Sequence, residues 1–151
     1  MINPGLIYLL GAGGLYFIKD KLRWQLASLL SLITMVYVWL LPAEAEIAVD
    51  FLDFKLLLLA NNQISRILAT SFIVFGLASS LYAAQHAGQK YYSLASVYIG
   101  GAVAILFVGD LFSFYICWEL MTISSYFLIF TNQRPITRQT SYYYFIMHLV
   151  G

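Results

Sequence analysis

The stretch 114-FYICWELMTISSYFLIF-130 is almost wholly apolar, yet it contains the carboxylate of Glu119. With the three residues before it, the apolar segment reaches the roughly 20 residues that a helix needs to cross the hydrocarbon core of a bilayer. A charged side chain near the middle of such a helix costs about 2.5–3.5 kcal/mol on insertion scales. The segment Leu111–Phe130 therefore predicts a membrane helix whose carboxylate requires an explanation.

The composition of the whole chain also favours a bilayer as its solvent. Its 151 residues are 62% hydrophobic and 10% charged, whereas soluble domains usually contain about 25% charged residues. A net charge of +1 argues against a nucleic-acid partner. The lone Cys117 excludes an intrachain disulfide and a metal–thiolate cluster, and no stretch resembles a phosphate-binding loop, so we expect no metal and no cofactor.

Four more apolar segments are predicted to be membrane helices, namely Ile2–Ile18, Leu26–Leu41, Ile64–Ala84 and Tyr91–Val108. A sixth helix begins near Thr140 and is incomplete at Gly151, so we expect a fragment of a longer protein. The predicted fold class is all-α, a polytopic membrane protein with five transmembrane helices and the start of a sixth. Residues 42–63 are acidic, partly alternate in polarity and then become a leucine run. They are predicted to form an extended or interfacial segment, not a span.

The charges in the predicted loops indicate an orientation. The first, third and fifth loops contain the basic residues Lys19, Lys21, Arg23, Lys90, Arg134 and Arg138, whereas the second and fourth contain the acidic residues Glu44, Glu46, Asp50, Asp53 and Asp110. Because Lys and Arg collect on the cytoplasmic side, we expect the N-terminus outside and the odd loops in the cytoplasm. The predicted location is the inner (plasma) membrane.

Small residues at four-residue spacing predict close packing between helices. On one helix they are Ser96, Gly100 and Ala104, and on another Gly76, Ser80 and Ala84. The glycine-rich stretch 11-GAGG-14 lacks the preceding strand and the third spaced glycine of a nucleotide-binding fingerprint, so it also indicates packing.

Glu119 is the first candidate site residue. Carboxylates inside a membrane usually face a bundle interior or a water-filled cavity and mark ion or proton paths. Burial favours the neutral form and a nearby cation the ionised form, so a balanced group can bind and release a proton. The alternative is a protonated glutamate that hydrogen-bonds a neighbouring helix. Tyr115 and Thr122 share its helix face and either hold a water near it or pack; Ser124 and Ser125 are expected to bond their own helix.

His148 is the second candidate. Histidine titrates near neutral pH and can pass protons on; the alternative is a neutral ring that binds a backbone carbonyl. Counted from Thr140, His148 lies roughly 12 Å along its helix, a depth comparable to that of Glu119. Asp110 either caps the next helix or also serves a proton exit. Arg66 either anchors its helix at the interface or forms an ion pair with an acid of another segment.

Two stretches, 109-GDLFSFYICWELMTISSYFLI-129 and 142-YYYFIMHLVG-151, resemble a known family. It is the family of antiporter-like membrane subunits shared by respiratory complex I, energy-converting hydrogenases and Mrp-type sodium/proton antiporters. The shared features are the Gly-Asp turn, W-E-L, the serine pair and H-x-x-G. The resemblance is weaker over Asn62–Val108, and the family often has an acidic residue where Asn62 stands.

The resemblance implies a protein of about fourteen helices with two inverted repeats. It implies that residues 1–63 are two leading helices with an external loop and that residues 64–151 begin the proton-translocating domain. Glu119 would be the family's key glutamate, whose partner is a lysine on a broken seventh helix. His148 stands where the D-type branch of the Mrp antiporter family often has a histidine, which favours that branch.

The predicted function is proton translocation within a multisubunit cation/proton antiporter or a complex I-like assembly. The expected partners are the bilayer, other membrane subunits, protons and, as a second cation, sodium. The chain is not expected to be an enzyme by itself, although the host can be redox-driven, as NADH:quinone oxidoreductase is. The alternative is a structural or assembly protein that moves no ions; a carrier for a small solute is a third, weaker interpretation.

Overall fold

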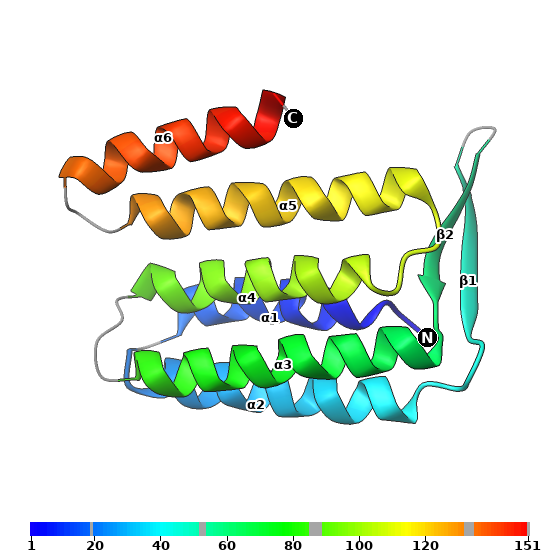
Figure 1. The fold of residues 1–151 in the computed structure, drawn as a ribbon. Coiled ribbons are helices and arrows are strands. Elements are labelled where there is room, and N and C mark those ends of the chain that lie inside the picture. The colour runs from blue at the N-terminus through cyan, green and yellow to red at the C-terminus, as the bar shows by residue number, and fades with distance from the viewer. Residues whose placement is uncertain (19, 52–53, 85–88, 132–134, 151) are drawn as a thin grey trace.

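The computed structural model describes residues 1–151 apart from positions 19, 52–53, 85–88, 132–134 and 151. The described chain is mostly helical, with the helices lying side by side and a β-hairpin standing across one end (Figure 1). In chain order the elements are α1 (Pro4–Phe17), α2 (Asp20–Leu40), β1 (Glu46–Phe51), β2 (Phe54–Ala60), α3 (Gln63–Ala83), α4 (Gln89–Ile105), α5 (Leu111–Phe130) and α6 (Pro135–Val150).

The hairpin corrects the all-α prediction and confirms that this segment is extended. The strands β1 and β2 pair antiparallel. The backbone after α4 continues the hydrogen bonding along β2, because Ala60 N donates to Phe107 O at 2.5 Å and Gly109 N donates to Leu57 O at 2.8 Å. Backbone polar groups need such partners wherever water is excluded. With these bonds available, the leucine run forms a strand against the bundle, although its composition alone would also suit a helix.

Two helices begin earlier than the sequence predicted. Helix α2 begins at Asp20 and α6 at Pro135, whereas apolar patterning placed these starts at Leu26 and near Thr140. A segment predicted from hydropathy stops at its first charged residues, whereas the helix itself can continue through polar turns. Among the described residues, three helical stretches are long and apolar enough to cross a membrane: Leu22–Leu40, Gln63–Ala83 and Leu111–Phe130. Helices α1 and α4 are apolar but shorter, so the number of five spans is not established.

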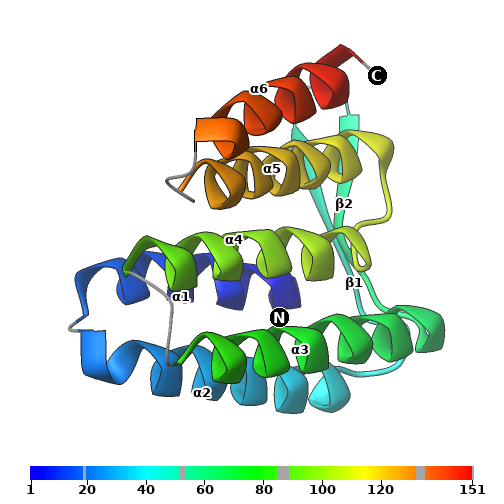
Figure 2. The same cartoon turned by 60° about the vertical axis from the view of Figure 1, so that its left-hand side comes forward.

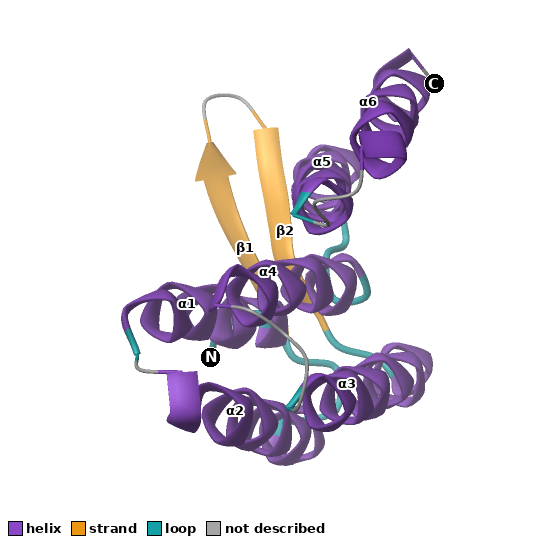
Figure 3. Cartoon of the chain, turned by 90° about the vertical axis from the view of Figure 1, so that its left-hand side faces the viewer, coloured by secondary structure: helices purple, strands orange, loops and turns teal. Residues whose placement is uncertain are grey.

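The helices are arranged in layers. In the end-on view, α1 and α4 lie next to each other, α2 and α3 pack below them, and α5 follows on the other side of α4, with α6 outermost (Figure 3). Consecutive helices run in opposite directions, so the C-terminal ends of α1, α3 and α5 lie away from the hairpin (Figure 2). This alternation agrees with the predicted succession of loops, but it does not say which end faces the cytoplasm.

The core lies among α1–α4 and also includes Leu59 of β2 and Phe107, which follows α4. It contains residues from both sides of the predicted domain boundary at residue 63, and that boundary stays a prediction. Its fully buried side chains include Tyr8, Ile73, Val103 and Phe107.

The contact between α1 and α4 depends on two glycines. A Cβ at Gly5 would overlap the carbonyl oxygen of Gly100, and a Cβ at Gly100 would lie 2.8 Å from Tyr8 Cβ. Ser96 and Ala104, the other small residues of this stripe, are also buried. The stripe predicted on this helix therefore lies where two backbones approach closely.

Candidate functional site

Glu119 lies near the middle of α5. It follows Leu111 by eight residues, which places it roughly 12 Å from the hairpin end of the helix and roughly 17 Å from the other end. Its side chain is half-buried. The Tyr115 hydroxyl, one turn earlier, interacts with the Glu119 carboxylate, and the Tyr115 side chain is 59% exposed. The carboxylate therefore lies at mid-helix, on a partly open face, with a phenol beside it.

Thr122 shares the face of Glu119 but has a different environment. Its side chain is buried, and its hydroxyl donates to the carbonyl of Trp118 at 3.1 Å. The environments of Tyr115 and Thr122 differ because the two residues lie in different halves of α5. Tyr115 is in the half nearer the hairpin, whereas Thr122 lies closer to the turn where Tyr126 packs on Phe145 of α6. Of the two predicted neighbours, the structure brings Tyr115 to Glu119 and leaves the Thr122 hydroxyl bonded within α5.

The serine pair joins α5 to α6. Ser124 donates to Met121 O at 2.9 Å, as expected for a serine that bonds its own helix. Ser125 donates to Thr122 O at 2.8 Å and also reaches the Tyr144 hydroxyl at 3.1 Å. The sequence prediction did not include this second contact, because no local pattern indicates that Tyr144 lies beside Ser125. The Ser125–Tyr144 contact is thus a polar link between the two helices with the proposed site residues.

His148 lies on α6 and is exposed. Its ring centre is 4.3 Å from that of Tyr144. Because α6 begins at Pro135, His148 lies roughly 20 Å along the helix, measured from the end at which Glu119 is roughly 17 Å deep. The two depths remain comparable after this correction. Within the described residues, no hydrogen bond or ion pair joins His148 to Glu119.

Asp110 caps α5 and also holds the hairpin. Its Oδ1 accepts the Ser113 N–H at 2.8 Å, and its Oδ2 accepts the Leu57 N–H of β2 at 2.9 Å. Burial acts to raise the pKa of the Asp110 carboxyl, but the hydrogen bonds from Ser113, Leu57 and Phe112 outweigh it and hold the pKa below its usual range. The capping role is therefore seen directly, together with a tie to β2.

Arg66 has neutral oxygens as its partners in the described chain. Its Nε donates to Asn61 Oδ1 at 3.2 Å and its Nη2 to the Leu41 carbonyl at 2.5 Å. The adjacent Asn62 caps α3 by accepting the Ser65 N–H at 2.8 Å. A carboxylate can fill the same capping position. Asn62 is therefore a helix cap in this chain.

One functional contact was missed. Asn3 precedes Pro4, and its Oδ1 caps α1 by accepting the Gly5 N–H at 2.9 Å. Its Nδ2 also donates to Leu58 O at 2.9 Å and to Ala104 O at 3.1 Å, which joins α1 to β2 and α4. An Asn-Pro pair signals a helix start, but no local pattern indicates the distant partners. Within the described chain, no cluster of three or more His, Cys, Asp or Glu side chains could hold a metal.

Comparison with known proteins gives three findings. The family model described as NADH:quinone oxidoreductase/Mrp antiporter, TM, matches residues 108–151. The D subunit of the Na(+)/H(+) antiporter of Bacillus subtilis (strain 168) is 30% identical over 100 residues, which are 63% of this chain and 20% of that protein. The structure of the membrane-bound sulfane sulfur reductase, an archaeal respiratory membrane complex, contains a similar chain with a TM-score of 0.81 and 24% identity.

These relatives are much longer than this chain. The structural match covers 95% of this chain but 24% of the other, and at its level of identity it shows the fold. The family match covers the residues that carry the resemblance seen in the sequence, including Glu119 and His148. Fold and motif thus agree, and both support the resemblance of this chain to the antiporter-like membrane subunits of NADH:quinone oxidoreductase and the Mrp antiporters.

Proposed function

We propose that this chain is part of a proton-translocating subunit of a multisubunit cation/proton antiporter or complex I-like membrane assembly, with Glu119 as the proton-exchanging group. The observation that carries the proposal is the position of Glu119. It is a carboxylate near the middle of a 20-residue apolar helix, inside the segment that the family model matches. The Bacillus relative is a subunit of a Na(+)/H(+) antiporter, which makes protons and sodium the candidate ions for this chain.

The surroundings of Glu119 suit proton exchange. The Tyr115 hydroxyl interacts with the carboxylate from an exposed position and can relay a hydrogen bond to water. His148 lies at a comparable depth on α6, and the Ser125–Tyr144 contact holds α5 and α6 together one turn from that histidine. Because no direct bond joins Glu119 to His148 in the described part of the chain, a proton would pass between them through water. Asp110 supports this site from the end of α5 by fixing the start of the helix.

The same proposal includes the arrangement in the membrane. Helices α1–α5 each cross the bilayer and α6 enters it from the side opposite the hairpin. The hairpin end, with Glu44, Glu46 and Asp50, faces outward, and the basic helix ends face the cytoplasm. Arg66 anchors α3 at the outer interface. Lipid covers part of the exposed apolar surface, and other membrane subunits of the assembly cover the rest.

The test is the variant Glu119→Gln in the intact assembly, because it removes the titrating group and keeps the shape. Proton flux is followed in everted membrane vesicles with a pH-sensitive dye, with and without sodium, and is divided by the amount of assembled protein. Glu46→Gln, the same change at an exposed position of β1, is the matched control. We expect Glu119→Gln to assemble normally and to lose at least about tenfold in flux, which corresponds to about 1.4 kcal/mol, while Glu46→Gln stays at the unmodified level.

Unchanged flux in Glu119→Gln would make the transport role wrong and would favour the structural or assembly role instead. If Glu119→Gln fails to assemble, Glu119→Asp decides, because it keeps the titrating group. An assembled Glu119→Asp variant that retains partial flux supports the proposal.

A further inference from the structure

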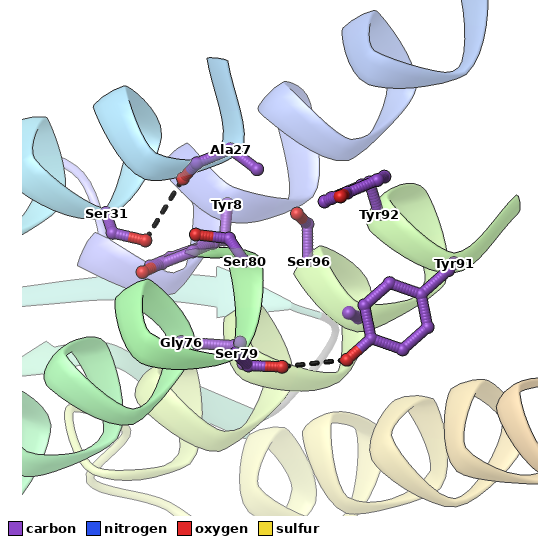
Figure 4. A pocket seen from close by; sticks show the side chains of 11 residues that line it. Tyr8, Ala27, Ser31, Gly76, Ser79, Ser80, Tyr91, Tyr92 and Ser96 are labelled. Atoms are coloured by element: carbon purple, nitrogen blue, oxygen red, sulfur yellow. Dashed lines mark hydrogen bonds between the residues drawn. The ribbon is translucent and has the colours of Figure 1, made fainter. Parts of the chain in front are cut away.

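A small polar cavity lies inside the leading bundle, away from Glu119. It has room for about 10 Å³, close to what one buried water needs. All four leading helices contribute to its wall, through Tyr8 of α1, Ser31 of α2, Ser80 of α3 and Ser96 of α4. In Figure 4 the hydroxyls of Tyr8, Ser31 and Ser80 gather on one side of this space, whereas that of Ser96 points toward Tyr92.

The Tyr8 hydroxyl has an unmet need for a partner. The Tyr8 side chain is 1% exposed, and its Oη forms no hydrogen bond within the described chain. The Ser31 hydroxyl lies near enough to act on it as a hydrogen-bonding neighbour, but the two oxygens do not meet the geometry of a hydrogen bond. The Ser31 hydrogen is committed to the Ala27 carbonyl at 3.1 Å (Figure 4). Gly76 has no side chain, and a Cβ at this position would lie 3.4 Å from Tyr8 Oη. The glycine therefore leaves the space beside the Tyr8 hydroxyl open. Buried hydroxyls without any partner are rare in native proteins.

The neighbouring serines have acceptor capacity to spare. Ser80 donates to Leu77 O at 2.8 Å and lies 2.9 Å from Ser28 Oγ. Ser28 in turn donates to Trp24 O at 2.8 Å. A hydroxyl has one hydrogen and two lone pairs. When the serine hydrogens go to these carbonyls, lone pairs remain on Ser31 and Ser80. Neither oxygen forms a hydrogen bond with Tyr8 Oη, so the Tyr8 hydrogen has no acceptor within the described chain.

We propose that this cavity binds one ordered water, which accepts a hydrogen bond from Tyr8 and donates to Ser31 and Ser80. One water supplies both the acceptor that Tyr8 lacks and the donors that the serine lone pairs lack. Three bonds are the usual number for a buried water. The site joins α1, α2 and α3, and α4 separates it from α5. It is therefore a structural water of the leading bundle and does not belong to the route through Glu119.

The test is a density map of the intact assembly at a resolution that shows ordered water, for the unmodified protein, Tyr8→Phe and Tyr91→Phe. Tyr91 lines the same cavity but has Ser79 as its partner at 2.8 Å, so it is the matched control. We expect a water peak about 2.7–3.2 Å from the oxygens of Tyr8, Ser31 and Ser80. The peak should vanish in Tyr8→Phe and persist in Tyr91→Phe.

Three outcomes would overturn the proposal. One is an unmodified protein without the peak, in which Tyr8 bonds Ser31 directly. Another is a peak that survives in Tyr8→Phe. The third is a Tyr8→Phe variant that assembles fully but loses proton flux, because the water would then belong to a transport path. If Tyr8→Phe does not assemble, the map of the unmodified protein decides by itself.

Discussion

The leading bundle α1–α4 and the outer pair α5–α6 treat polar groups in opposite ways. In the bundle, the polar cluster around Tyr8 consists of neutral hydroxyls, and the side chains of Tyr8, Ser31 and Ser80 are buried. In the outer pair, the ionisable Glu119 and His148 lie on partly or fully exposed positions. The helices of the bundle are also more buried than α5. Inside the chain, 28% of the spans in α2 and α3 is buried, against 17% of the α5 span.

This difference separates two kinds of role. The bundle buries large side chains around close backbone contacts, which stabilises a fixed arrangement of helices. The outer pair keeps charge-bearing groups where lipid, water or a further protein surface can reach them. We therefore expect substitutions in the bundle to change assembly, and substitutions near Glu119 to change transport in assembled protein. Each prediction below can break that division.

The largest effect on stability is expected from Gly5→Ala. Its Cβ would overlap the backbone of α4 at Gly100 and Ala104, and backbone cannot move aside as a flexible side chain can. Overpacking of this kind costs about 1–3 kcal/mol. We expect a marked loss of assembled protein in the membrane and a lower midpoint of thermal unfolding.

Gly13→Ala is the matched control on the same helix, because nothing lies within 4 Å of the added Cβ. It should leave the amount of assembled protein unchanged or raise it slightly, since alanine is the better helix former. Equal behaviour of the two variants would show that α1 and α4 do not approach as closely as the structure describes.

The second prediction concerns Asp110, at the junction of the two regions. Asp110→Ala removes the cap of α5 and the bond to Leu57, and a lost cap alone costs about 0.5–2 kcal/mol. We expect faster hydrogen exchange in β2 and in the first turn of α5. Asp50→Ala, an exposed aspartate in β1, should leave both unchanged.

The contribution of Asp110 to the stability of the fold should also depend on pH. The pKa of its carboxyl is lower in the folded chain than the ordinary value of 3.8, so the ionised form is the one that stabilises the fold. The stabilisation is full above pH 3.8 and is lost as the pH falls through the folded pKa. The protection difference between unmodified protein and Asp110→Ala should therefore shrink in acid; a difference that grows in acid would contradict this account.

Helix identity could be read from the sequence because apolar composition over about 20 residues reports burial in lipid or protein. The hairpin could be predicted only as an extended segment. Its strand β2 depends on bonds to Phe107 and Gly109, which lie about fifty residues further along the chain. The helix starts at Asp20 and Pro135 were missed because polar first turns carry no hydropathy signal.

In the candidate site, too, some features could be predicted from the sequence and others could not. Glu119 stands out in sequence because a charge in an apolar run is expensive, and the Asp110 cap follows from the local pattern. By contrast, the Ser125–Tyr144 link and the bonds of Asn3 to Leu58 depend on which helices become neighbours. The roles of Glu119 and His148 in proton transfer stay predictions.

The third prediction tests whether the Tyr115 hydroxyl beside the Glu119 carboxylate matters for proton transfer. Tyr115→Phe removes the hydroxyl that interacts with the carboxylate and keeps the ring. The carboxylate loses the phenol hydroxyl beside it, so proton flux per assembled protein should fall. Assembly should be unchanged because Tyr115 is 59% exposed. Tyr82→Phe, at an 85% exposed position of α3, is the control, and an equal loss of flux in both variants would contradict a specific role for Tyr115.

The smallest effect is expected at the link between α5 and α6. Ser125→Ala and Tyr144→Phe each remove one side of the 3.1 Å contact, and each should lower stability by about 0.5–1 kcal/mol. If the two hydroxyls bond each other, the double variant should be as stable as the less stable of the two single variants. Either single change already removes the hydrogen bond, so the second change removes no further interaction. Additive losses would mean that the two side chains act independently. In that case the Ser125–Tyr144 contact would not hold α6 to α5, and it would no longer support a proton relay between His148 and Glu119.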